Sequence, residues 1–275
     1  MPGNFDPAKF KTADAQLSAR IKAQCGLSFA AVAPTLASAA EASAAAAVKP
    51  GKERWPVKTG RDSHAGDVGL AEGGRAPVIV DTTIEELRRL LRPDNMQDVG
   101  ANNPEFQEKR AVPVELTIWR ISGFVTAVKN EADGDLHLAL QGESGDTMIA
   151  ESARPDAVFL GKRNPWLPAL KKVRAAIEDK QFMASLASVS LVRSTQGELV
   201  PQGSFDSSRL DAAALAAPMS AATALKSGLK FKARISARKA RITGVGFFDR
   251  VHNQTGVAIT NGIELHPIFD FKWLT

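Results

Sequence analysis

The middle of the chain carries a stretch in which apolar and polar residues alternate. Val114, Leu116 and Ile118 are separated by polar or bulky residues, and the alternation continues to Val128. A period of two is typical of a β-strand with one buried face. Gly123 lies inside this stretch, and a glycine allows a strand to bend sharply without a Cβ clash. The pattern therefore predicts one long, bent strand.

Further alternation predicts four more strands after this one. They span residues 136–140, 147–151, 239–248 and 262–271. Asp133-Gly134 is a hairpin signal before the first of them. A helix is predicted between the third and fourth strands, because Asn164-Pro165 supplies an N-cap followed by a proline at the first helical position.

Three strands, a helix and two strands are the element order of a small five-stranded barrel of OB type. We therefore expect a mainly β protein in which residues 112–275 form such a barrel with an inserted helix. Residues 184–229 form a less readable insertion, with a hairpin signal at Gln196-Gly197. The positions that we expect to point inward are Ile118, Leu138, Ile149, Val245 and Ile263.

The first 111 residues differ in pattern from the barrel. Residues 1–48 are rich in alanine and serine and predict a helical or disordered arm, or alternatively a displaced signal peptide. Residues 49–111 predict a linker on which Trp55 packs against the barrel. A short helix is expected over residues 81–92, with Thr82 and Thr83 as caps.

Composition narrows the classes of site. Hydrophobic residues make up 44% and charged residues 24% of the chain, which is ordinary for a globular protein. The single cysteine, Cys25, excludes an intramolecular disulfide and a multi-cysteine zinc site. The sequence contains no run of about 18 apolar residues, so it does not predict a membrane-spanning helix. The long leader before the apolar segment favours a cytoplasmic location over export, with the compartment left open.

The net charge of +5 is concentrated in one basic run. It contains seven cations and no acid: Lys226, Lys230, Lys232, Arg234, Arg238, Lys239 and Arg241. As an extended segment, the run would present a cationic stripe to the phosphates of single-stranded nucleic acid. Phe247, Phe248 and Trp119 are the aromatic residues that we expect to stack on bases. The alternative is a solvated edge strand whose lysines prevent aggregation.

One set of polar residues suggests a metal site. Glu264 and His266 are two apart on a predicted strand and so share one face, and Asp249 and His252 begin the loop before it. Two imidazoles and two carboxylates suit zinc, manganese or iron. The alternative is a hydrogen-bonded network that ties the loop to the barrel, with His266 bonded to a carboxylate.

Two motifs resemble a bacterial protein family of unassigned activity. One runs from Asp133 to Leu140 and on through Thr147–Glu151. The other contains Gly244-Val245-Gly246-Phe247-Phe248-Asp249 and Asn261-Gly262-Ile263-Glu264-Leu265-His266-Pro267. The segment from Trp55 to Asp62 is similar to part of the same pattern. This resemblance implies a shape rather than an activity.

A more distant similarity is to the thermonuclease (staphylococcal nuclease-like) barrel. It implies a calcium site in which Asp135 is the turn carboxylate and Glu151 and Asp156 are the later pair. The arginines that this family places beside the scissile phosphate have no counterparts here, since the third strand reads Thr-Met-Ile-Ala-Glu and Arg154 lies beyond it. The family's own means of stabilising the phosphorane is therefore not expected.

These observations favour a non-enzymatic binding module of OB type, with a polyanion such as single-stranded nucleic acid as its ligand. The first alternative is a metal-dependent phosphodiesterase or nuclease-like enzyme that uses one of the two carboxylate sets. The second is an exported barrel that binds a protein partner or a glycan.

Overall fold

The structure is a computed structural model that describes residues 53–71, 75–96, 105–156, 160–161, 164–194, 198–203, 218–251 and 255–275. The predicted N-terminal arm, with Cys25, and the predicted ligand His252 lie outside the described residues. Within them, no helix is long and apolar enough to cross a membrane.

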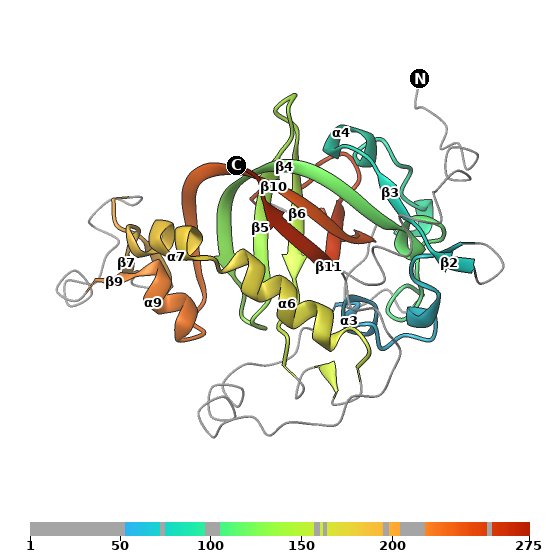
Figure 1. The fold of residues 1–275 in the computed structure, drawn as a ribbon, viewed down its shortest axis with the longest axis horizontal. Helices are drawn as coiled ribbons and strands as arrows, with labels where there is room; N and C mark the ends of the chain where they lie inside the picture. Colours follow the sequence, from blue (N-terminus) through green and yellow to red (C-terminus); the bar gives the residue numbers. More distant parts are fainter. Residues whose placement is uncertain are drawn as a thin grey trace.

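The described residues form a mainly β structure (Figure 1). Its nine-stranded sheet has the order β3-β4-β5-β6-β11-β10-β8-β7-β9, and β4 also pairs with β10. The strands of this sheet are β3 (Ile79–Asp81), β4 (Ile118–Asn130), β5 (Leu136–Gln141), β6 (Thr147–Ser152), β7 (Ser190–Arg193), β8 (Leu199–Pro201), β9 (Met219–Ser220), β10 (Phe231–Phe248) and β11 (Ile263–Trp273). A separate pair consists of β1 (Leu70–Ala71) and β2 (Arg75–Pro77).

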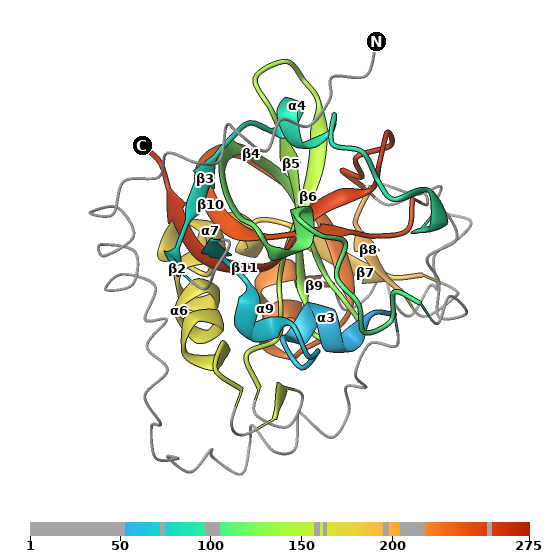
Figure 2. The same ribbon diagram turned by 90° about the vertical axis from the view of Figure 1, so that its right-hand side faces the viewer.

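Five of these strands pair in succession. β4 pairs with β5, β5 with β6, β6 with β11, β11 with β10, and β10 with β4. The β6–β11 pair is parallel and the other four are antiparallel. Figure 2 shows these strands curving around one interior. All five predicted strands are present. Their order in the sheet differs from their order along the chain, because β11 lies between β6 and β10.

The helices are short and lie around this set of strands. They are α3 (Trp55–Thr59), α4 (Ile84–Leu87), α6 (Leu167–Ile177), α7 (Lys180–Ala187) and α9 (Ala221–Lys226). Three 3₁₀ turns span Ala65–Asp67, Asp94–Met96 and Val114–Leu116. The predicted helix after Asn164 is confirmed as α6: the Asn164 side chain accepts a hydrogen bond from the Trp166 amide at 2.8 Å.

The apolar residues form two buried clusters. The first includes Leu138 and Ile263 and extends from the inward face of the five strands to α4 and the insertion, with Ile84, Phe182 and Leu191 among its members. The second includes Ile118 and Val245 and packs against α3 and α6. Ile149 is also buried, but it alternates with Met148 and Ala150, which belong to the first cluster. All five predicted inward positions are therefore buried, and they are divided between the two faces of the sheet.

The first strand begins later than predicted. Residues 112–117 are not part of a strand, because Val114–Leu116 forms a 3₁₀ turn and β4 starts at Ile118. The turn forms around the Glu115 side chain, which is fully buried and accepts a hydrogen bond at 2.6 Å from the amide of Ala111, four residues earlier. The apparent alternation in this stretch was a turn that buries a charge.

The helix predicted over residues 81–92 is shorter. α4 covers Ile84–Leu87 and begins with the expected Thr83 cap, which is reinforced by Glu86 in a capping box. The carbonyls after it are taken by other partners: the Asn261 side chain donates to Leu87 and Leu90, each at 3.0 Å. Leu91, which lies beyond the end of α4, is exposed.

The described part of residues 49–111 is integrated into the fold. β3 pairs in parallel with β4, and Trp55 is buried as predicted. Arg54 and Arg110 are buried as well, and each forms an ion pair. This segment is therefore part of the main body rather than a linker beside it.

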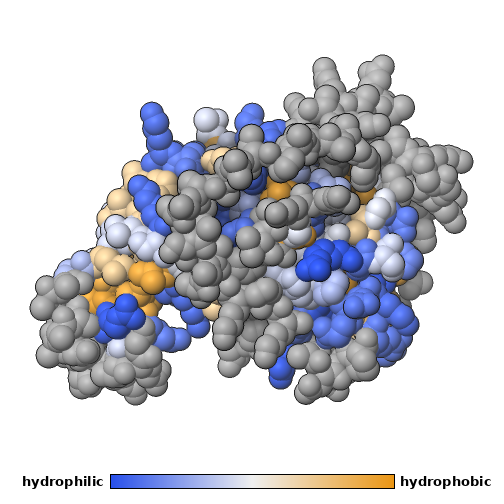
Figure 3. All heavy atoms as spheres, turned by 90° about the horizontal axis from the view of Figure 1, so that it is seen from below, coloured by the Kyte–Doolittle hydropathy of each residue, from blue (hydrophilic) through white to orange (hydrophobic). Residues whose placement is uncertain are grey.

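The insertion contains α7, β7, β8, β9 and α9, which gather at the left of Figure 1. β7 and β8 form the predicted hairpin, although residues 195–197 at its tip are not described. Figure 3 shows an apolar area at this end and mostly hydrophilic side chains over the remaining coloured surface. β10 starts at Phe231 instead of residue 239, so most of the basic run is its first half.

A candidate acid–histidine site

Six ionisable side chains meet on the outer face of β5, β6 and β11, the face opposite the first apolar cluster. We call them the acid–histidine cluster: Asp135, His137, Glu151, Asp249, Glu264 and His266. Each of them is at most 6% exposed. Strand alternation explains the placement, since Leu138, Ala150 and Leu265 point into the interior and their neighbours in sequence point outward.

His266 lies at the centre of this cluster. Its Nδ1 is 2.8 Å from Glu151 Oε2 and 3.3 Å from Glu264 Oε1. Its Nε2 is 3.5 Å from Asp135 Oδ2. Three carboxylates from three segments of the chain therefore surround one imidazole, which is fully buried.

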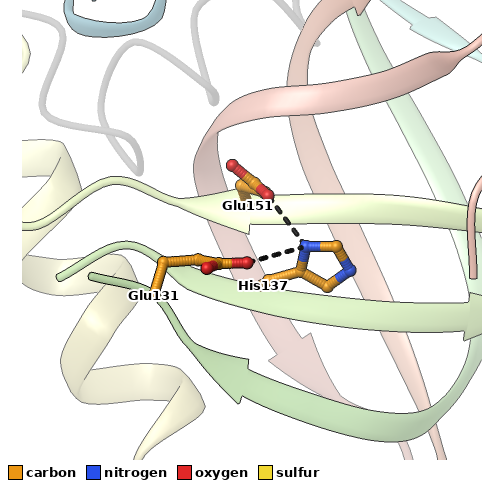
Figure 4. Close-up of side chains that lie close together, drawn as sticks. All are labelled: Glu131, His137 and Glu151. Atoms are coloured by element: carbon orange, nitrogen blue, oxygen red, sulfur yellow. Dashed lines mark hydrogen bonds and ion pairs between the residues drawn. The ribbon is translucent and has the colours of Figure 1, made fainter. Parts of the chain in front are cut away.

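The second imidazole, His137, shares Glu151 with the first. Its Nδ1 is 2.9 Å from Glu151 Oε1 and 3.9 Å from Glu131 Oε1, and Figure 4 shows both carboxylates pointing at this nitrogen. Its Nε2 is 3.0 Å from the carbonyl oxygen of Thr255, in the loop before β11. The two oxygens of Glu151 thus face two different histidines.

A half-buried lysine, Lys58 of α3, adds a cation to the cluster. Its ammonium lies 5.1 Å from the centre of the Phe247 ring. Two buried ion pairs hold α3 in place on either side of it. Arg54 donates to both carboxylate oxygens of Glu115 at 2.7 Å, and Arg110 donates to both oxygens of Asp62 at 2.9 and 2.6 Å.

The charges of the cluster shift its pKa values strongly. Burial opposes the charged form of His266, but the charge of Glu151 and hydrogen bonds with Asp135, Glu151 and Glu264 outweigh it and raise the pKa of His266 well above its usual value. Burial likewise opposes ionisation of Glu151, yet His266 and His137 together hold its pKa well below the usual range. The pKa of His137 is raised, because Glu151 more than offsets the effect of burial.

Two further carboxyls and the lysine are also shifted. Burial, with the charges of Glu151 and Asp249, raises the pKa of Glu264 to about 7. Burial and the neighbouring Asp135 raise the pKa of Asp133 to about 6. For Lys58, burial favours the neutral form, but the surrounding carboxylates outweigh it and raise its pKa. Such concentrated perturbation is characteristic of functional sites, although ion-pair networks also produce it.

The donor set fits a divalent metal. One ligand atom each from Asp135, Glu151 and His266 lie within 4.8 Å of one another, and the same holds for Glu131, His137 and Glu151. Among the described residues, buried Glu264 Oε2 has no hydrogen-bond partner, and His266 Nε2 has the Asp135 carboxylate at 3.5 Å. Mixed imidazole and carboxylate ligands suit zinc, manganese or iron.

Five residues of the two metal sets that the sequence suggested lie in one cluster: Asp135, Glu151, Asp249, Glu264 and His266. β6 and β11 pair in parallel, and this brings Asp135 and Glu151 to Glu264 and His266. Asp249 joins them because its amide donates to the Gly262 carbonyl at 2.9 Å, which closes the loop onto β11. Asp156, the other predicted calcium ligand, lies 3.5 Å from Arg154 Nε.

Sequence reasoning missed Lys58, His137 and Glu131. His137 carried a usable signal, since it is two residues from Asp135 on a predicted strand and so shares its face. Lys58 lies in the short segment from Trp55 to Asp62, which resembled the same bacterial family as the other cluster segments. Its position depends on buried ion pairs that no spacing in the chain reveals.

The basic run is partly available for binding. Lys232, Arg234 and Arg241 are exposed. Lys230 lies 3.4 Å from Glu198, and Arg238 lies 2.9 Å from Asp179 and stacks on Trp273. The aromatic residues expected to stack on bases do not fit that role. Phe247 and Phe248 are fully buried and Trp119 is 2% exposed. Trp119 and Phe248 belong to the first apolar cluster, and the Phe247 ring lies against Arg54, Lys58 and His266.

Comparisons with protein-family models, with curated proteins and with solved structures find no match. The two resemblances drawn from the motifs therefore stay predictions.

Proposed function

We propose that β4, β5, β6, β10 and β11 form an OB-type barrel. The support is the pairing order, in which the third and fifth strands of the set are parallel neighbours and the fourth closes back onto the first. α6 lies between the third and fourth strands in the chain, as in that fold.

We propose that the acid–histidine cluster is the metal site of a hydrolase that acts on phosphodiesters. The observation that carries this proposal is the meeting of Asp135, Glu151 and His266, each with a ligand atom within 4.8 Å of the others, and with buried Glu264 beside His266. Burying several carboxylates together is costly unless cations compensate them. Asp135, Glu151 and His266 would hold a divalent ion, which would supply a nucleophile near neutral pH by acidifying water.

The chain's own residues have separate roles in this proposal. Asp135, Glu151 and His266 hold the ion, and His137 fixes the orientation of Glu151 through its Nδ1. Lys58 offers a positive charge to the anionic oxygens of a phosphodiester. Glu264, which contacts His266, is placed to accept a proton from a water.

A purely binding function is less well supported, because its stacking residues are buried. The exported glycan- or protein-binding alternative stays a prediction, since nothing in the geometry of the cluster favours it.

The test is hydrolysis of bis(p-nitrophenyl) phosphate by protein that has been stripped with a chelator. We expect no turnover until Mn²⁺ or Zn²⁺ is added. Glu151→Gln should lower kcat by about 100-fold or more, because even residues that only support metal ligands cost 10–100-fold. Glu143→Gln is the matched control, since Glu143 is 71% exposed and pairs with Lys239 outside the cluster.

Metal-dependent turnover that survives Glu151→Gln would place the reaction elsewhere. Folding of the variant is checked by its melting temperature. Asp135→Asn serves as a second variant if Glu151→Gln does not fold. No turnover with any divalent ion would refute the hydrolase.

A further inference from the structure

Two rows of side chains cross the outer face of the sheet and connect the basic strand with the acid–histidine cluster. In the first row, Lys232 of β10 is paired with Lys129 of β4, Lys129 with His137 of β5, and His137 with Glu151 of β6. Strands lie about 4.8 Å apart, so Lys232 is about 14 Å from Glu151 along the row.

The second row runs beside the first. Arg234 is paired with Ala127, Ala127 with Ala139, Ala139 with Ile149, and Ile149 with Glu264. The side chains between the cation and the cluster carboxylate are small or apolar. The row therefore offers no acid to repel an anion until it reaches Glu264.

The charges at the open end of the rows favour an anion. Lys232 and Lys129 are directly opposite each other on one face, and like charges in that position destabilise a sheet. Lys129 pairs with Glu131 and is 30% exposed, whereas Lys232 and Arg234 are exposed and make no ion pair among the described residues. A bound phosphate backbone would remove this repulsion.

The exposed part of the two rows ends where Thr255 and Gly256 lie over β5. Thr255 contacts His137 through its carbonyl, and Gly256 lies against Ala139, where an added Cβ would be 2.8 Å from the alanine Cβ. The exposed cations on β10 and β4 therefore lead to the edge of the loop that contains Thr255 and Gly256.

We infer that Lys232, Arg234 and Lys129 form a track that binds the phosphate backbone of single-stranded nucleic acid and leads it to the acid–histidine cluster. This inference rests on the proposed function, because it names the substrate class of the same site. The contacts are to phosphates only, so binding does not depend on base sequence.

The test separates binding from hydrolysis. In a chelator, the affinity for a labelled oligothymidylate is measured by fluorescence anisotropy at several salt concentrations. Each phosphate contact on a single strand contributes about −0.7 to the slope of log affinity against log salt. The double variant Lys232→Gln/Arg234→Gln should therefore flatten the slope by about 1.4.

The matched control is Lys171→Gln/Lys172→Gln, which removes the same charge from the exposed face of α6 and should leave the slope unchanged. With metal restored, the β10 double variant should keep its kcat on bis(p-nitrophenyl) phosphate and show a raised KM only on the oligonucleotide.

An unchanged slope in the β10 variant would overturn the track. If that variant also aggregates, its cations protect the strand edge instead. Salt-dependent binding without hydrolysis of either substrate would retain the track and refute the hydrolase, so the two failures are distinguishable.

Discussion

Arg54 is the residue on which the position of α3, and therefore of Lys58, most depends. It immediately precedes α3 in the left-handed conformation, with φ of 49°, and its side chain is fully buried. It donates to both oxygens of Glu115 and to the carbonyls of Phe106, Lys109 and Phe248. Removing one partner of a buried ion pair leaves the other as an uncompensated buried charge, which strongly destabilises the folded protein.

Glu115→Gln should therefore be strongly destabilising. The amide keeps an acceptor for the Phe248 amide, but it places an N–H group or a neutral oxygen against the Arg54 guanidinium. We expect a loss of about 3–5 kcal/mol in the free energy of unfolding, measured in urea. Asp81→Asn, in the exposed pair with Arg120, should cost less than about 1 kcal/mol. Similar losses for the two variants would contradict the role assigned to the buried pair.

At the scale of elements, β10 is the strand whose packing depends most on glycine. Its pairing with β11 shifts register on both sides of Gly244, before Gly246. A Cβ on Gly244 would lie 2.8 Å from the carbonyl oxygen of Pro267. Gly244 therefore permits a close approach of two strands.

Gly246→Ala should show how tightly β10 packs against β4 and the Val114–Leu116 turn. The added Cβ would lie 2.6 Å from the Val114 carbonyl oxygen and 2.7 Å from Trp119 Nε1, two atoms joined by a hydrogen bond. Overpacking of this kind costs about 1–3 kcal/mol, which should lower the melting temperature by several degrees. Gly66→Ala is the control, since nothing lies within 4 Å of its Cβ. Equal melting temperatures for both variants would show that β10 has room to shift.

For the whole molecule, the alternation of apolar and polar residues predicted that each strand exists better than it predicted the residues at which the strand begins and ends. β5 was found because Leu136, Leu138 and Leu140 alternate with other residues over its length, whereas β6 and β11 carry shorter stretches of alternation. The first half of β10 was read as a basic run, since Lys232 and Arg234 are outward residues of a strand whose inward residues include Ala233. The sequence around Glu115 looked like alternation because a charged residue was expected to face solvent. In the structure Glu115 is buried by Arg54, which is 61 residues away along the chain.

The candidate site was predictable only in fragments, for the same reason. Spacing along one strand placed Glu264 beside His266, but the contact of His266 with Glu151 depends on a parallel pairing between strands separated by more than a hundred residues. Lys58 depends on two ion pairs between distant segments. Pairing between strands and buried charge are properties of the whole fold, so no short motif contains them.

Metal binding, if it occurs at the cluster, must stabilise the whole molecule, because the ligands come from strands that unfold together. A metal at about 100 times its Kd contributes about 2.7 kcal/mol. For a chain of this size that should raise the melting temperature of stripped protein by roughly 5–10 °C. Mn²⁺ or Zn²⁺ should produce this rise in the wild type and in Glu143→Gln, and the rise should disappear in Glu151→Gln. If no divalent ion moves the melting temperature of the stripped wild type, Lys58 and His266 already neutralise the carboxylates, and the cluster is a structural network that ties the Thr255 loop to β5.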